Sequence, residues 1–146
     1  MSILGTGGFP PALDGSFSVY LYGGSTASSA SISQTGLVPA GAESLLFEAQ
    51  NDGGVSGGAL SVSLGGQNIP FFAVSTGSNY TLYGGNVSAY AGKSELLMFS
   101  ALQGENNAWE IDDIQFSPMA APEPGVLGLL GMGGLLFGLC RWKKIV

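Results

Sequence analysis

The segment 57-GGALSVSLGG-66 alternates apolar and small polar residues, and glycines bound it at both ends. Leu60, Val62 and Leu64 fall on one side of an extended chain, with serines on the other. This period-two alternation is typical of a strand that buries one face. The segment 16-SFSVYLY-22 repeats the pattern, so the sequence predicts β-structure at two separate places.

Six further segments have the same short, apolar-rich character, and Gly-, Asn- and Ser-rich turn signals separate them. They are residues 29–35, 43–50, 69–75, 79–84, 94–101 and 108–117. Regularly spaced short strands indicate an all-β antiparallel β-sandwich. We expect it to occupy residues 1–117 and to be a jelly roll, because that arrangement places eight strands in two sheets.

The composition excludes several functional classes. The chain has ten acidic residues but only four basic ones, three of which lie in the last six positions, so nucleic-acid binding is not expected. It has no histidine, and Cys140 is its one cysteine. Zinc sites built from His and Cys are therefore excluded, as are Ser-His and Cys-His catalytic pairs. No phosphate-binding loop is present and no spacing singles out a pair of catalytic carboxylates, so we do not expect an enzyme.

The pattern changes after residue 117. Residues 118–124 are rich in proline and predict an extended linker. Residues 125–140 carry no charge and would span ~24 Å as a helix, which is short for a membrane span of ~30 Å. A buried core helix is the alternative, but its glycines are better tolerated in a membrane. We therefore expect a transmembrane helix there and a basic cytoplasmic tail at 141–146.

The order of these parts is specific. Pro122-Glu123-Pro124, a Gly/Leu-rich apolar run and the basic cluster Arg141, Lys143 and Lys144 together resemble the PEP-CTERM sorting signal of bacteria. The resemblance covers about residues 121–144 and implies export and processing near the triplet by an exosortase, a membrane-embedded transpeptidase. It implies an inner-membrane precursor whose C-terminus is cytoplasmic, and then a place at the cell surface or in an exopolysaccharide matrix.

Members of that family carry an export signal, and the first residues of this chain do not resemble one. The segment 1-MSILGTGGFPPALDG-15 lacks a basic start and an uninterrupted apolar stretch. We therefore expect an upstream segment that includes the signal peptide, and a β-sandwich that is incomplete at its N-terminus.

The β-domain is more loosely similar to galactose-binding-like jelly rolls, many of which bind carbohydrate. Segments such as 79-NYTLYGGNVSAYAG-92 and the closing 109-WEIDDIQFS-117 carry this resemblance. It implies that Asp112, and with it Asp113, helps to hold a structural calcium ion. Ile111 and Ile114 cannot share a face in a regular strand, so these acids also predict a bulge.

Aromatic side chains could stack on sugar rings, and Trp109 and Tyr83 are the candidates for this contact. The same residues would serve equally well in the core of a sheet. Three roles for the β-domain stay open at this point: a carbohydrate-binding module, a structural matrix protein with no discrete ligand, and a hydrolase, of which the last is the weakest.

Overall fold

The computed structural model describes residues 1–5, 7, 10–24, 29–53 and 58–121. These residues form strands and one short 3-10 turn, η2 (Ser88–Tyr90). The strands are β1 (Ser2–Gly5), β2 (Phe17–Gly23), β3 (Ala30–Leu37), β4 (Ser44–Asn51), β5 (Leu60–Leu64), β6 (Gln67–Asn68), β7 (Phe72–Thr76), β8 (Thr81–Asn86), β9 (Ser94–Ala101) and β10 (Asn107–Ser117).

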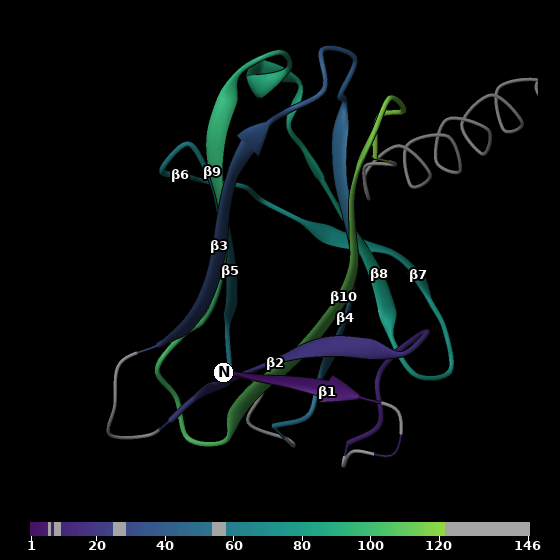
Figure 1. Ribbon diagram of the computed structural model, residues 1–146, viewed down its shortest axis with the longest axis vertical. Coiled ribbons are helices and arrows are strands. Elements are labelled where there is room, and N and C mark those ends of the chain that lie inside the picture. Colours follow the sequence, from purple (N-terminus) through teal and green to yellow (C-terminus); the bar gives the residue numbers. More distant parts are fainter. Residues whose placement is uncertain (6, 8–9, 25–28, 54–57, 122–146) are drawn as a thin grey trace, which may run out of the picture.

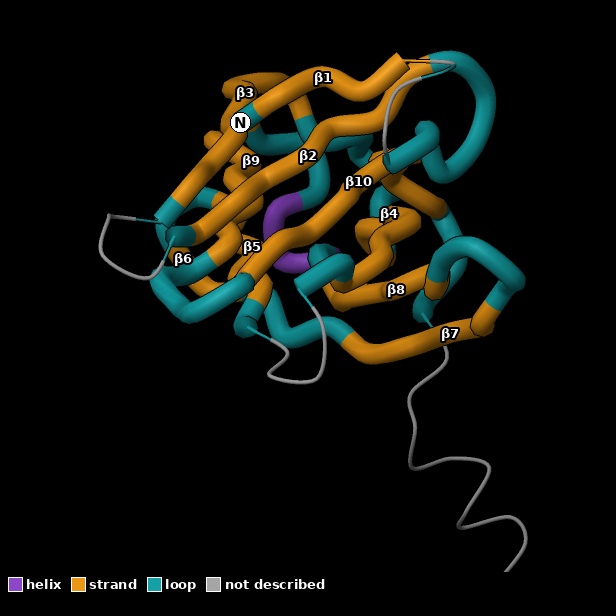
Figure 2. The backbone as a smooth tube through the Cα atoms, turned by 90° about the horizontal axis from the view of Figure 1, so that it is seen from below, coloured by secondary structure: helices purple, strands orange, loops and turns teal. Residues whose placement is uncertain are grey.

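The strands make two antiparallel sheets that face each other (Figure 1). Sheet A has the order β1-β2-β10-β4-β8-β7, and sheet B has the order β3-β9-β5-β6. Sheet A is therefore the wider layer, and Figure 2 shows β1 and β2 running along the side of the molecule where β3 also lies. The prediction of an all-β protein with antiparallel sheets is confirmed.

The core lies between the sheets and is built from alternate residues of the central strands. Leu60, Val62 and Leu64 are at most 8% exposed, as their alternation with serine predicts. Phe47 of sheet A meets Phe99 of sheet B edge to face, with ring centroids 5.0 Å apart. Because the apolar rows of both sheets point inward, burial of these rows supplies the main driving force for folding.

All eight strands expected from the sequence are present, and β1 and β6 are additional. The turn between β5 and β6 has Gly65 and Gly66 with φ of 59° and 77°, a left-handed conformation that glycine adopts without strain. The predicted bulge is also confirmed, because the register of β10 against β4 shifts between Asp112 and Gln115.

The bulge changes the direction of the following side chains. Asp113 has a φ of 41°, and beyond it Ile114 lines the space between the sheets together with Phe116. Ile111 is 1% exposed on the same inner face of sheet A. Two isoleucines three positions apart thus share a face, which a regular strand would not permit.

The chain beyond β10 follows the outer face of sheet A. The Ser44 hydroxyl donates to the carbonyl oxygen of Met119 at 2.7 Å. A Cβ placed on Gly84 would lie 2.9 Å from the Cβ of Ala121, so the glycine leaves room for this segment. The first part of the expected linker is thus attached to the sandwich, while the expected helix at 125–140 and tail at 141–146 lie outside the described residues.

Candidate functional site

The acidic residues of β10 belong to a larger carboxylate cluster on the outer face of sheet A. Asp112 pairs with Glu48 of β4, and Glu110 lies two positions earlier on the same face. The backbone N–H of Asp14, in the β1–β2 loop, reaches the Asp112 carboxylate at 3.4 Å. Three separate segments therefore bring like charges together at one place on the sheet.

Two carboxyl groups of this cluster are buried. Glu110 is 1% exposed and accepts hydrogen bonds from the Ser18 hydroxyl and the Leu13 backbone. Burial raises the pKa of the Glu110 carboxyl above its ordinary value, and the bond from Ser18 opposes that rise in part.

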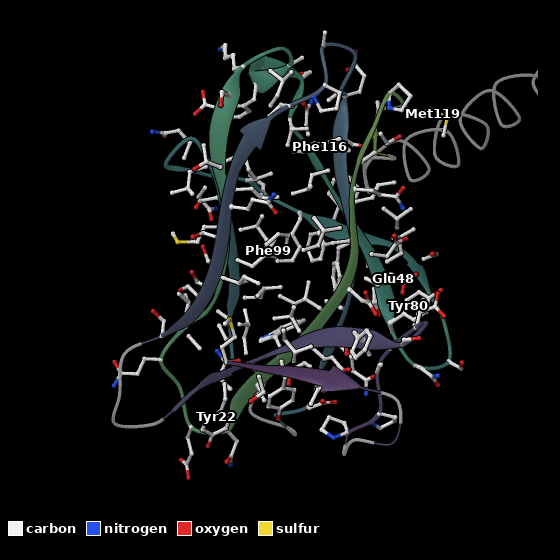
Figure 3. The ribbon with its side chains drawn as sticks, in the orientation of Figure 1. Tyr22, Glu48, Tyr80, Phe99, Phe116 and Met119 are labelled. Carbon is white, nitrogen blue, oxygen red and sulfur yellow. The ribbon has the colours of Figure 1, made fainter. Side chains whose placement is uncertain are left out.

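Glu48 is the second buried carboxyl group, and its side chain is 7% exposed. Figure 3 shows it beside Tyr80, with which it shares a hydrogen bond. Its second oxygen, Oε2, has no hydrogen-bond partner. Burial is the main cause that raises the pKa of Glu48, and the nearby charges of Asp113, Asp14 and Asp112 act in the same direction.

The candidate calcium ligands Asp112 and Asp113 lie at the bulge, and local donors occupy their oxygens. The backbone N–H of Asp113 donates to Asp112 Oδ1 at 2.8 Å, and Gln115 Nε2 donates to Asp113 Oδ2 at 3.0 Å. Within the described part of the chain, no group of three or more His, Cys, Asp or Glu side chains is arranged to hold a metal ion. The calcium site therefore stays a prediction from resemblance.

The structure brings the candidate sugar-stacking residues together, but inside the sandwich. The rings of Tyr83 and Trp109 are 6.4 Å apart, and both are half-buried against the core. Phe47 stacks on Tyr83 at 5.5 Å, and Trp109 Nε1 donates to the carbonyl oxygen of Gly58 at 3.0 Å. These contacts explain both rings by packing, and sugar contact at either ring stays a prediction.

A concave surface lies elsewhere, between the edges of β3 and β10. It is a groove with a volume of about 300 Å³, lined on the side of sheet B by Ile32, Gln34, Glu95 and Leu97, and on the side of sheet A by Ile114 and Phe116. Figure 3 shows Phe116 between the two sheets in the upper half of the molecule.

No motif in the sequence pointed to the groove, although one signal for it exists. Gln34 and Gly36 follow Ala30 and Ile32 on the face of β3 that otherwise points to the core. An inward row that changes from apolar to polar indicates that the core ends there. On β9, Leu97 pairs with Gln34 and Glu95 pairs with Gly36, so Glu95 adds a charged side chain to this end of the inner face.

The predicted sorting motif, Pro122-Glu123-Pro124, lies outside the described residues, and so does the basic cluster Arg141, Lys143 and Lys144. Among the residues that are described, no helix has the length and hydropathy needed to cross a membrane. Comparison of the chain with protein-family models, with curated proteins and with solved structures finds no match.

Proposed function

We propose that this chain is the precursor of an exported bacterial surface or matrix protein, sorted by its C-terminal segment. The observation that carries the proposal is the order of parts: an acidic β-sandwich, then Pro122-Glu123-Pro124, the apolar run 125–140 and the basic end. The basic cluster would keep the C-terminus in the cytoplasm, so the sandwich would stand outside until an exosortase processes the chain.

The test is a replacement of Pro122, Glu123 and Pro124 together by alanine, in a bacterium that has an exosortase and with an export signal fused ahead of the chain. The variant should accumulate unprocessed in the inner membrane. Pro118→Ala, a proline change outside the triplet, is the matched control and should be processed normally. Normal processing of the triple variant would contradict the sorting proposal.

We further propose that the sandwich is a jelly roll. Omitting β1 and β7, the two sheets have the orders β2-β10-β4-β8 and β3-β9-β5-β6. Apart from the paired strands β5 and β6, both in sheet B, successive strands of this set alternate between the two layers, which is the arrangement of two Greek keys in a jelly roll. A shared fold of this kind does not establish a ligand, so the role of the domain has to be argued from its surfaces.

The surfaces favour a structural role in the matrix over a role in catalysis. The candidate stacking residues Trp109 and Tyr83 pack inside the sandwich, and the buried carboxyls Glu48 and Glu110 lie on a face that loops cover. We therefore propose that the β-domain is a structural component of the extracellular matrix.

Carbohydrate binding is the second candidate, and the groove favours it. The Gln34 amide and the Glu95 carboxylate could bind sugar hydroxyls, while Phe116 offers an apolar contact. A glycan array probed with the purified protein, with and without calcium, separates the two roles: binding that Gln34→Ala abolishes supports the module, and a blank array counts against it.

A further inference from the structure

Among the described residues, two strand edges on one side of the sandwich have no partner strand. β3 is the terminal strand of sheet B, and its eight residues Ala30–Leu37 include no charge and no proline. β10 pairs with β2 only from Asn107 to Ile111, so no strand of the described chain pairs with its remaining residues on that side. Natural proteins usually protect such edges with charges, prolines or bulges, and β3 has none of these.

Strands β1 and β2 cover one half of this side, and the groove lies in the other half. Figure 1 shows β1 and β2 crossing it near the lower end. Phe116, which lines the groove, lies in the upper half (Figure 3). Ile3 pairs with Val19, and Phe17 with Gly5, so Ile3 and Phe17 share the face of sheet A that packs on the core. They are nevertheless 72% and 67% exposed, because sheet B does not extend over them.

The charge pattern points to a second copy of this chain as the occupant. The protein has a net charge of −6, so two copies repel each other over most of their surfaces. Between Asp14 and Glu43 the chain has no charged residue, and this stretch supplies β2 and β3. Of the groove residues named above, only Glu95 is charged, so two acidic copies can approach each other on this side with little repulsion.

We propose that two copies pair through β3 in an antiparallel manner about a twofold axis perpendicular to sheet B. This symmetry places the lower half of one copy against the upper half of the other. The projecting strands β1 and β2 of each copy, with Ile3 and Phe17, then lie over the open groove of the partner at Ile114. One contact thus joins the two sheets B edge to edge and covers the exposed apolar residues of both copies.

Cysteine cross-linking of the full chain, purified as the unprocessed precursor in mild detergent, tests this pairing. Cys140 is first replaced by serine, and single cysteines are placed at Ser31, Ser33 or Thr35 on the outer face of β3. Each variant is oxidised alone and in pairwise mixtures, because the axis determines which two positions lie opposite each other. Opposed residues of antiparallel strands have Cα atoms about 4.5–5.5 Å apart, within the reach of a disulfide.

Leu96→Cys is the matched control. Leu96 pairs with Thr35 and faces the same side one strand further from the edge, so in the dimer it would lie about 14 Å from its twin, too far for a disulfide. We expect disulfide dimers from at least one edge position or mixture and only background from Leu96→Cys. Ile114→Lys, which puts a charge into the groove, should reduce the edge cross-link to that background.

Edge cysteines that cross-link no better than Leu96→Cys would overturn the proposal, as would a cross-link that Ile114→Lys leaves unchanged. Oxidation in intact cells that joins β3 only to a different protein would also overturn it and would identify another occupant. The purified precursor needs no processing for this experiment, so its outcome is independent of the sorting proposal.

Discussion

At the scale of single residues, the buried carboxyls Glu48 and Glu110 make the stability of the fold depend on pH. Burial raises the pKa of both groups, so the folded state binds their protons more tightly than the unfolded chain does. The stability that the neutral carboxyls provide is fully present below the unfolded pKa, near 4.5, and is lost as the pH rises through the folded pKa.

We therefore expect a higher unfolding temperature at about pH 5 than at about pH 7.5, measured by circular dichroism on the detergent-solubilised chain. Glu110→Gln, which keeps the shape of the side chain without its charge, should raise the unfolding temperature at the higher pH and flatten its dependence on pH. Glu43→Gln changes an exposed carboxyl and is the control. Equal pH dependence of Glu110→Gln and the parent would contradict this assignment.

Gly23 of β2 and Gly36 of β3 should respond differently to replacement by alanine. A Cβ on Gly23 would collide with the carbonyl oxygen of Leu102 and lie 2.7 Å from that of Ala101, whereas a Cβ on Gly36 would meet nothing within 4 Å. Gly23→Ala should cost about 1–3 kcal/mol in the free energy of unfolding, because backbone must move. Gly36→Ala should be neutral or stabilise the fold by up to about 1 kcal/mol.

Urea denaturation followed by circular dichroism gives both values for the Gly23 and Gly36 variants. If Gly36→Ala lowers the free energy of unfolding as much as Gly23→Ala does, the close approach of a Cβ on Gly23 to the carbonyl oxygen of Leu102 is not the cause of the loss.

At the scale of elements, alternation and turn composition predicted the long strands, but not the short ones. β1 and β6 have four and two residues, and each pairs with a longer neighbour that determines its place. A segment of that length has too few side chains to show a period. The bulge in β10 was predictable because Ile111 and Ile114 require it, whereas the covering of Glu48 and Glu110 by distant loops left no local signal.

The bulge itself can be tested through the φ of 41° at Asp113. Aspartate tolerates this left-handed conformation, a β-branched side chain does not, and glycine adopts it freely. Asp113→Val should destabilise the fold by about 1–2 kcal/mol, while Asp113→Gly should change it by less than about 1 kcal/mol.

The variants Asp113→Val and Asp113→Gly also test the candidate calcium site. If Asp113 is a ligand, chelation of calcium should lower the unfolding temperature of the parent but not that of Asp113→Gly. Identical responses to chelator would remove Asp113 from the site, and equal stability of the Val and Gly variants would contradict the account of the bulge.

At the scale of the whole molecule, sequence patterns identified the strands but not their neighbours. Gln34, Glu95 and Ile114 border one groove although they are far apart in the chain, because β3 pairs with β9 and the end of β10 faces both. Which strands form an edge is decided by the packing of two sheets, and no local pattern contains that information. The change from Ile32 to Gln34 indicated where the core ends, but the strands that border the groove and the free edge of β3 could be found only in the assembled fold.

The attachment of residues 118–121 to the sandwich has a consequence for the proposed sorting. Ser44 holds the carbonyl oxygen of Met119, the N–H of Met119 donates to the Ser117 hydroxyl at 3.1 Å, and Ala121 lies against Gly84. Pro122 is the next residue, so the proposed sorting triplet directly follows a segment that is attached to the sandwich. If a membrane-embedded exosortase processes this triplet, the folded domain restricts its approach.

A short Gly/Ser insertion between Ala121 and Pro122 should therefore speed processing, because it lets the sandwich move away from the triplet. Pulse-chase labelling with separation of precursor and processed chain measures the rate. The same insertion between Gly77 and Ser78, in the exposed β7–β8 turn, lengthens the chain without changing this spacing and should leave the rate unaltered. Unchanged processing after the Ala121 insertion would show that the domain does not restrict the enzyme.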